Sequence, residues 1–307
     1  MKHEPGRGCY RGRVNYRHAF HAGNLADLLK HTALIELLRL LTRKDKPLLV
    51  VDTHAGRGGY DLGAVPAART AEAAGGIHRL MAAGERGAPE PVKRYLAAVR
   101  GYDRKFGPAR RPLSHYPGSP RLVRGLLRPG DRFVACELQG GEAQALRREF
   151  AGDKAIEVRE TDGLKALRAL LPPRERRALV FVDPPFEKPD EFERLARELG
   201  QARRRLATGC YAIWYPLKDP VAVATFEASL PAGWLRLELA LPDGAVPAGK
   251  LAACALAIVN PPWTFAEVLE EALAWIAARI EGRFSVALRP AGAPASRSSD
   301  SKSSANG

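Results

Sequence analysis

The chain has 307 residues, of which 46% are hydrophobic and 27% charged, an ordinary composition for a globular protein with a full core. It contains no apolar run near the ~20 residues that span a bilayer and no apolar leader, so we expect a cytoplasmic protein. The net charge of +14 favours a nucleic-acid partner without identifying one, because an arginine-rich solvated surface has the same composition.

The N-terminal part begins with a basic stretch, residues 1–15, that we expect to be a flexible extension. The segment Tyr16–Asn24 follows and is rich in aromatic, histidine and arginine side chains. Apolar residues then recur at helical spacing over residues 25–42, and Asn24 is a suitable N-cap. We therefore expect an amphipathic helix before the first strand.

Four runs of apolar or β-branched residues, each followed by an acidic residue, come next along the chain. They are residues 48–51 before Asp52, 132–136 before Glu137, 156–161 before Asp162, and 178–182 before Asp183. Short apolar runs followed by helical patterns are typical of buried parallel strands, and ligands bind outside the carboxyl ends of such strands. The four acidic ends therefore predict a polar ligand along one edge of the sheet.

The C-terminal half completes this pattern. Residues 209–215 predict a fifth strand, and residues 235–241 and 254–260, joined by a turn, predict a closing antiparallel pair. A helix is expected over residues 265–280. The expected fold is α/β, a Rossmann-like methyltransferase sheet that is mostly parallel with an antiparallel edge strand.

Two segments fall outside a plain sheet. The first two strands are about eighty residues apart, far more than a crossover needs, and residues 64–110 have helical patterns. We expect a small helical inserted subdomain there, within one methyltransferase domain that spans residues 16–290. Residues 291–307 are rich in Ala, Pro and Ser and should form a disordered tail.

The sharpest motif is Asp183-Pro184-Pro185-Phe186, at the end of the fourth strand. The lone pair of an adenine N6 amine is delocalised into the ring, so a catalyst must accept hydrogen bonds from that amine. Asp183 can accept one and the carbonyl of Pro184 another, while Phe186 offers a face for an extruded base. The simpler interpretation, a proline-rich turn, explains the prolines but not the residues on either side of them.

Asn260-Pro261-Pro262-Trp263 has the same shape but follows the last expected strand. It lies far from the expected ligand site. We interpret it as the turn into the C-terminal helix, with Trp263 packing against the protein.

Three further segments fit a nucleotide-like ligand. The glycine-rich loop after Asp52 carries His54, and Glu137 stands where a carboxylate takes ribose hydroxyls. Asp162, beside Gly163, suits the adenine end of the same ligand. Ser119, followed by Pro120, suits a helix N-terminus that could hold an anion. For Glu137, Asp162 and Ser119 the simpler interpretation is helix capping, and for the loop a glycine-rich turn.

The seven histidines do not predict a metal site, because no metal-binding spacing such as HExxH is present. His31 lies in the middle of the first expected helix, where a lone histidine is usually packed. The four cysteines are far apart and form no CxxC pair, so neither a disulfide framework nor a zinc knuckle is expected.

Taken together, these segments resemble the RlmJ family, bacterial methyltransferases that modify an adenine N6 in large-subunit ribosomal RNA. The resemblance extends from Tyr16 to the C-terminal helix. It is carried by YRHAFHAGNLADLLKH (16–31), DKPLLVVDTHAGRGGY (45–60), YPGSP (116–120), the strand end at Glu137, TDG (161–163), VDPPF (182–186), ATGCYAIWYP (207–216) and IVNPPW (258–263).

The resemblance implies a monomer without a metal that uses S-adenosyl-L-methionine on 23S ribosomal RNA, either naked or in an early assembly intermediate. It implies Asp183, Pro184 and Phe186 as catalytic residues. It further implies that the donor is bound by a larger set, His31, His54, Ser119, Glu137, Asp162 and Gly163. Contacts to RNA are implied for Tyr16, Arg17 and His18. The family usually has Tyr where this chain has Phe186, a change that preserves stacking.

Three alternatives remain open at this level. The same motif serves DNA adenine methylation, although no DNA-reading domain is recognisable. Glutamine-amide methylation usually uses Asn in place of Asp183. A basic RNA-binding or assembly factor with a vestigial donor pocket would have no activity at all.

Overall fold

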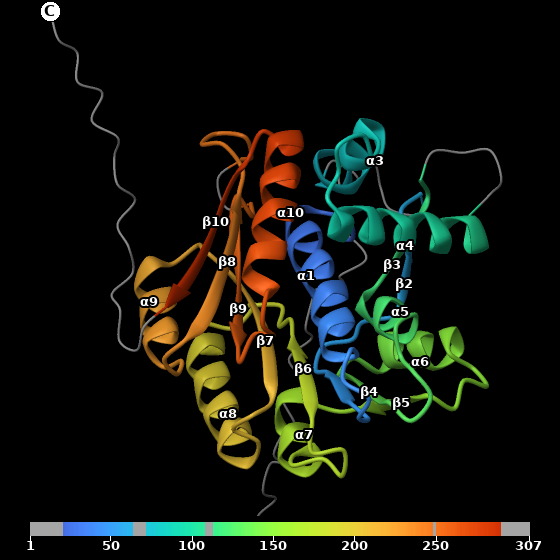
Figure 1. The fold of residues 1–307 in the computed structure, drawn as a ribbon, viewed down its shortest axis with the longest axis vertical. Coiled ribbons are helices and arrows are strands. Elements are labelled where there is room, and N and C mark those ends of the chain that lie inside the picture. The colour runs from blue at the N-terminus through green and yellow to red at the C-terminus, as the bar shows by residue number, and fades with distance from the viewer. Residues whose placement is uncertain (1–20, 64–71, 108–112, 248–249, 290–307) are drawn as a thin grey trace, which may run out of the picture.

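The computed structural model describes residues 21–63, 72–107, 113–247 and 250–289. Within these residues an eight-stranded sheet has the order β10-β8-β9-β7-β6-β1-β4-β5 (Figure 1). Its strands are β1 (Leu49–Asp52), β4 (Arg132–Glu137), β5 (Ile156–Glu160), β6 (Ala178–Val182), β7 (Cys210–Pro216), β8 (Trp234–Ala240), β9 (Ala253–Val259) and β10 (Arg283–Arg289).

The five strands from β7 to β5 are parallel, and the order of winding reverses between β1 and β6. The chain passes from β1 to β4 and β5 on one side, then returns to β6 and β7 on the other. A crevice at this reversal is where open α/β sheets bind ligands. The expected fold class, a mostly parallel Rossmann-like sheet with an antiparallel edge strand, is confirmed.

The antiparallel part differs in detail from the expectation. β9 lies between β7 and β8 and is antiparallel to both, as expected for the closing pair. The edge, however, is formed by β10, which pairs antiparallel with β8 and was not expected. Its sequence Arg283–Arg289 alternates Phe, Val and Leu with smaller or charged residues, the period-2 pattern of a half-buried strand.

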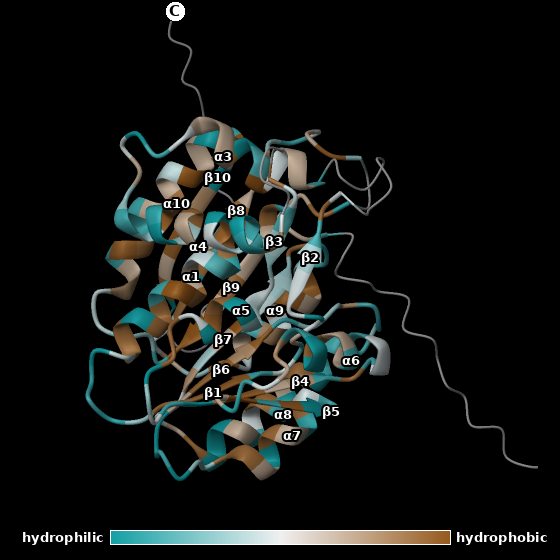
Figure 2. Cartoon of the chain, turned by 90° about the vertical axis from the view of Figure 1, so that its right-hand side faces the viewer, coloured by the Kyte–Doolittle hydropathy of each residue, from teal (hydrophilic) through white to brown (hydrophobic). Residues whose placement is uncertain are grey.

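Helices cover both faces of the sheet. α1 (Leu25–Leu41), α5 (Ser119–Arg124), α6 (Gly140–Glu149) and α10 (Phe265–Ile280) lie on one face, and α7 (Gly163–Leu170), α8 (Glu191–Arg205) and α9 (Pro220–Ala228) on the other. Two apolar clusters result, one on each side of the strands. Figure 2 shows the apolar strands enclosed by helices whose outer faces are polar.

The described part of the expected insertion is helical. It contains a π-helical turn, η2 (Ala74–His78), followed by α3 (Arg79–Ala83) and α4 (Glu90–Phe106), which contact α1 and α10 (Figure 1, teal). Two short strands, β2 (Gly59–Asp61) and β3 (His115–Pro117), bring the two ends of this segment together in a separate antiparallel sheet. None of the described helices is long and apolar enough to span a membrane.

Two helix expectations were wrong. α1 is not amphipathic: nearly every side chain is buried, including the charged Asp27, Lys30 and Glu36, because α10 and α4 cover the side that would otherwise face water. Ser119 does not cap α5, because its hydroxyl is turned toward Asp52. Asn24, by contrast, caps α1 as expected.

Candidate active site

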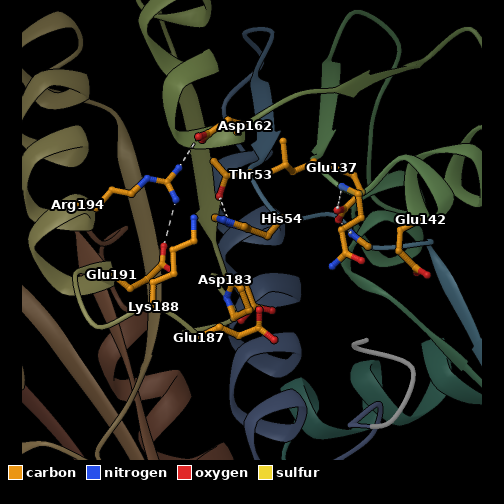
Figure 3. Close-up of a pocket in the computed structure, with 15 residues that line it drawn as sticks. Thr53, His54, Glu137, Glu142, Asp162, Asp183, Glu187, Lys188, Glu191 and Arg194 are labelled. Carbon is orange, nitrogen blue, oxygen red and sulfur yellow. Dashed lines mark hydrogen bonds and ion pairs between the residues drawn. The ribbon is translucent and has the colours of Figure 1, made fainter. Parts of the chain in front are cut away.

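A pocket opens where β1, β4 and β6 end, at the reversal of the sheet. Figure 3 shows Asp183, His54 and Asp162 on one side of it and Glu137 across from them. Its lining residues come mainly from the loops after these strands and from α8: Thr53, His54, Gly56, Glu137, Leu138, Gln139, Glu142, Asp162, Gly163, Asp183, Pro185, Glu187, Lys188, Glu191 and Arg194. Parallel strands place their carboxyl ends together, which is why residues this far apart in sequence meet here.

Glu137 is the last residue of β4, and the backbone holds its carboxylate in place. One oxygen accepts from the N–H of Gly56 at 2.9 Å and the other from the N–H of Gln139 at 2.7 Å. Burial raises the pKa of Glu137, and these two hydrogen bonds act against that shift. Each oxygen retains a further lone pair, so the carboxylate can still accept a pair of hydroxyl groups from a ligand.

Asp162 and Gly163 lie at the start of α7. One oxygen of Asp162 accepts from the Lys165 N–H, as a helix cap does, and the other is 2.5 Å from the Arg194 guanidinium. A Cβ on Gly163 would lie 2.1 Å from the carbonyl oxygen of Thr53. Only glycine therefore allows α7 to approach the loop after β1 this closely.

Asp52 and Ser119 lie beneath the pocket and form part of its support. The Ser119 hydroxyl donates to Asp52 at 2.6 Å, and the His54 N–H donates to the other oxygen at 3.2 Å. Burial raises the pKa of Asp52 to about 7, against these hydrogen bonds. Burial also lowers the pKa of His54 to about 4, so its imidazole is neutral at pH 7.

His31 lies apart from the lining of this pocket. It is buried on α1, where its Nδ1 is 2.7 Å from the hydroxyl of Tyr116 and the two rings are stacked. The position is the packed one that is usual for a histidine within a helix. His31 thus supports the β3 segment that leads into Ser119, and it does not share the pocket with His54, Glu137 and Asp162.

Asp183 forms a buried ion pair that sequence reasoning missed. Its carboxylate is 2.5 Å from the ammonium of Lys30, which is also 2.9 Å from Asp27 and 5.6 Å from the centre of the Trp214 ring. Lys30 is only 2% exposed. A lysine on a helix is usually solvated, and the only signal for this pair was the presence of charges in a helix that is otherwise apolar on all sides.

A second cavity lies on the other side of Asp183. It is lined by residues of α1, the inserted segment, the Asp183 loop and β7: His21, Asn24, Ala26, Lys30, Glu72, Asp183, Pro185, Phe186, Trp214, Pro216, Lys218, Lys250 and Leu251. Asp183 and Pro185 line both cavities and form the wall between them.

Phe186 faces this second cavity and has a left-handed backbone with φ of 49°. Its ring lies 4.6 Å from that of Phe192 and 5.8 Å from that of Trp214. Left-handed conformations are costly for a side chain of this size and occur mostly at functional sites. The aromatic neighbours fix the ring at the cavity wall.

Of the predicted site residues, His54, Glu137, Asp162, Gly163 and Asp183 share the first cavity, and Phe186 lines the second. Tyr16, Arg17 and His18 lie outside the described residues. Among the described residues no group of three His, Cys, Asp or Glu side chains is placed to hold a metal ion.

Comparison with known proteins gives consistent matches. The family model described as ribosomal RNA large subunit methyltransferase D, RlmJ, matches residues 45–287. Two proteins named ribosomal RNA large subunit methyltransferase J are similar. The one from Escherichia coli is 36% identical and covers 87% of this chain and 94% of its own length, and the one from Haemophilus influenzae is 35% identical, covering 86% and 92%.

A crystal structure of a Legionella pneumophila protein has the same fold. It superimposes with a TM-score of 0.79 at 32% sequence identity and covers 88% of this chain and 98% of its own. The similarity therefore extends over most of both chains.

Proposed function

The chain belongs to the RlmJ family of large-subunit ribosomal RNA methyltransferases, and from this premise we propose that it methylates the N6 amine of an adenine in 23S ribosomal RNA. The observation that carries the proposal is the wall shared by the two cavities. Asp183 lines both cavities, so it would reach a donor in one and an acceptor base in the other.

The first cavity fits S-adenosyl-L-methionine by the chemistry of its side chains. Six acidic side chains line it against two basic ones, Lys188 and Arg194, which suits a ligand that carries a sulfonium and an ammonium charge. Glu137 would accept the ribose hydroxyls, and Asp162 with Gly163 would bound the adenine end. The ligand supplies an electrophilic methyl group when it is bound.

The residues of the Asp183 loop would prepare the acceptor. We assign Asp183 and the carbonyl oxygen of Pro184 to accept hydrogen bonds from the two N–H groups of the amine. These bonds draw the nitrogen lone pair out of conjugation and toward the first cavity. Phe186 would stack on the extruded base, and two prolines keep the loop from rearranging.

Lys30 would act as a positioning residue for Asp183. The ammonium group is buried and lies between Asp27 and Asp183, so it fixes the rotamer of the carboxylate and offsets its charge. An aspartate held in this way meets the amine without a reorganisation step. The Tyr16–His18 segment, by its resemblance, would contact the RNA.

The test is methyl transfer by Asp183→Asn, which keeps the shape of the side chain but weakens it as an acceptor. We expect the rate of transfer to unmodified 23S RNA to fall by about 100-fold or more, while the affinity for S-adenosyl-L-methionine stays within a few-fold. Labelled donor and calorimetry measure the two quantities.

The same assay distinguishes the alternatives. If the wild-type protein methylates genomic DNA but not ribosomal RNA, it is a DNA methyltransferase. If it does not bind the donor, it is an RNA-binding factor. Full activity of Asp183→Asn would refute the proposed mechanism.

A further inference from the structure

The turn between β9 and α10 is rigid at both ends. Asn260 adopts a left-handed backbone with φ of 54°, and its side-chain amide donates to the carbonyls of Ala207 at 2.7 Å and Gly209 at 2.8 Å. Thr264 is also left-handed, with φ of 67°, and two prolines lie between them. Left-handed backbone at residues other than glycine is kept mostly where a local geometry has a use.

This turn presents Trp263 to solvent. The side chain is 90% exposed, which makes it the most exposed of the large hydrophobic side chains that the structure describes. The expectation that Trp263 packs against the protein was therefore wrong, because the turn leaves the indole exposed to solvent. Exposed indoles on rigid supports are typical of binding surfaces.

A groove runs beside Trp263 along the amino-terminal edge of the parallel strands. Its lining combines five basic side chains with two acidic ones: Leu40, Leu41, Arg43, Lys44, Asp45, Lys46, Leu48, Glu175, Arg176, Arg177, Ala178, Thr208, Cys210, Asn260, Pro261, Pro262, Trp263 and Thr264. Arg176 is a third left-handed residue of the groove, with φ of 55°.

The topology explains why these segments meet. The basic residues lie in the loops that precede β1 and β6. Thr208 lies in the loop between the arginine-rich end of α8 and the start of β7. Parallel neighbours begin at one edge of a sheet. β9 runs in the opposite direction beside β7, so its last residue and the turn after it arrive at that same edge.

Four of the five basic side chains of the groove are available to a ligand. Arg43, Lys44, Lys46 and Arg176 are exposed, and within the described residues none of them forms an ion pair. Glu175 is already held by Arg132 at 3.0 Å.

Two arginine side chains fix the backbone of the loop before β1. The Arg128 guanidinium donates to the carbonyl of Thr42 at 2.6 Å, and the Arg177 guanidinium donates to that of Lys46 at 2.8 Å. The cations of this loop are therefore presented from a fixed backbone.

We propose that this groove binds a single-stranded segment of the RNA substrate, with a base stacked on Trp263 and phosphates along Arg43, Lys44, Lys46 and Arg176. The proposal rests on the proposed function, since it takes RNA to be the substrate. Cations beside an exposed aromatic ring are the combination that binds single strands. A protein partner would call for a larger apolar surface than one indole and for fewer cations.

The groove lies at the opposite edge of the sheet from Asp183, so it cannot take part in the chemistry. It would hold a part of the RNA away from the target adenine and thereby raise the affinity for a long substrate. Loss of the groove should change RNA binding and leave the transfer step intact.

The test compares Trp263→Ala with Trp263→Phe on an unmodified 23S RNA transcript. We expect Trp263→Ala to raise the Kd and the KM for the transcript about five- to hundredfold, the range for the loss of one stacked base. The kcat at saturating RNA and the affinity for S-adenosyl-L-methionine should stay at wild-type values. Trp263→Phe, which keeps a ring, should restore most of the RNA affinity.

A second pair of variants tests the charges. Lys44→Ala/Lys46→Ala should lower the slope of log Kd against log salt by about 0.7 for each phosphate that the groove no longer neutralises. Arg148→Ala/Lys154→Ala removes the same charge from exposed positions outside the groove and should change the slope less.

Wild-type RNA affinity in Trp263→Ala, or equal salt effects in the two double variants, would overturn the groove proposal. If Trp263→Ala keeps its RNA affinity but no longer sediments with ribosomal particles, the proposal is also overturned, in favour of a protein partner. If the wild-type protein binds S-adenosyl-L-methionine but neither binds nor methylates the transcript, the proposed function itself fails.

Discussion

At the scale of single residues, the most unusual group is the buried carboxyl of Asp52. Among the described residues it forms no ion pair, and a hydroxyl and a backbone N–H hold it instead. Burial raises its pKa from 3.8 to about 7, so the folded protein keeps a proton that the unfolded chain releases near pH 4. The stability that this proton confers is present below about pH 4 and is lost as the pH rises to about 7.

The substitution Asp52→Asn removes this titration. We expect its stability relative to the wild type to increase steadily from pH 4 to pH 7 and then to level off, as measured by urea denaturation at a series of pH values. His54 titrates in both proteins, so its contribution cancels in the comparison. A stability difference that does not change with pH would contradict the assignment.

Asp131→Asn is the matched control, because the pKa of Asp131 is shifted in the opposite direction, below its usual value. Burial opposes ionisation of Asp131, but hydrogen bonds from Arg128 and from the Leu48 N–H outweigh it and lower the pKa. The variant should therefore be less stable than the wild type by an amount that stays constant between pH 5 and pH 8.

Residue positions were predictable where a side chain stands at a strand end. Glu137, Asp162 and Asp183 share a pocket because the topology alone places strand ends together. Lys30 could not be found in this way, because its partner is 153 residues away and Lys30 itself lies within a helix rather than at a strand end. The exposure of Trp263 was missed for a similar reason, since a tryptophan in an apolar context is usually buried.

At the scale of elements, the side chain of Glu227 on α9 contacts several strands of the antiparallel part of the sheet. It is 5% exposed and lies 2.8 Å from Arg236 of β8 and 3.4 Å from Arg289 of β10, and it accepts from Tyr215 of β7 at 2.7 Å. One carboxylate therefore connects β7 to the paired strands β8 and β10, which the backbone joins to β7 only through β9.

Within the described residues, replacing Glu227 by Ala leaves the largely buried Arg289 without its ion-pair partner and Arg236 with Glu238 alone. We expect a loss of about 3–5 kcal/mol in the free energy of unfolding, the range for breaking a buried ion pair. Glu157→Ala is the control, because its pair with Arg159 is exposed, and it should cost at most about 1 kcal/mol. Urea denaturation measures both, and similar losses would show that the edge does not depend on Glu227.

Element positions were largely predictable, and the exceptions have physical causes. The parallel strands and the closing pair follow from apolar runs and turn residues. β10 was missed although its sequence alternates, because half-buried edge strands carry a weaker apolar signal and this one directly precedes the tail. The burial of α1 on all sides was missed although apolar residues surround its axis, a pattern typical of a buried helix, and α4 and α10 cover it.

At the scale of the whole molecule, the proposed donor would stabilise the fold by binding only the folded state. At a concentration 100 times its Kd, S-adenosyl-L-methionine should add about 2.7 kcal/mol to the stability, a rise of roughly 5 °C in Tm. Thermal denaturation with and without donor measures this. The Tm shift should persist in Asp183→Asn and largely disappear in Glu137→Ala. A wild-type Tm that does not change when the donor is added would contradict the assignment of the pocket.

The wall between the two cavities has a consequence for inhibition. Asp183 and Pro185 line the cavity on each side of this wall, so a donor and an acceptor would be separated only by the width of one loop. A single compound in which an adenosine N6 atom is linked by a short chain to the methionine part of the donor could occupy both cavities at once. Its second half would bind at a high effective concentration, so such a bisubstrate compound should exceed either half in affinity.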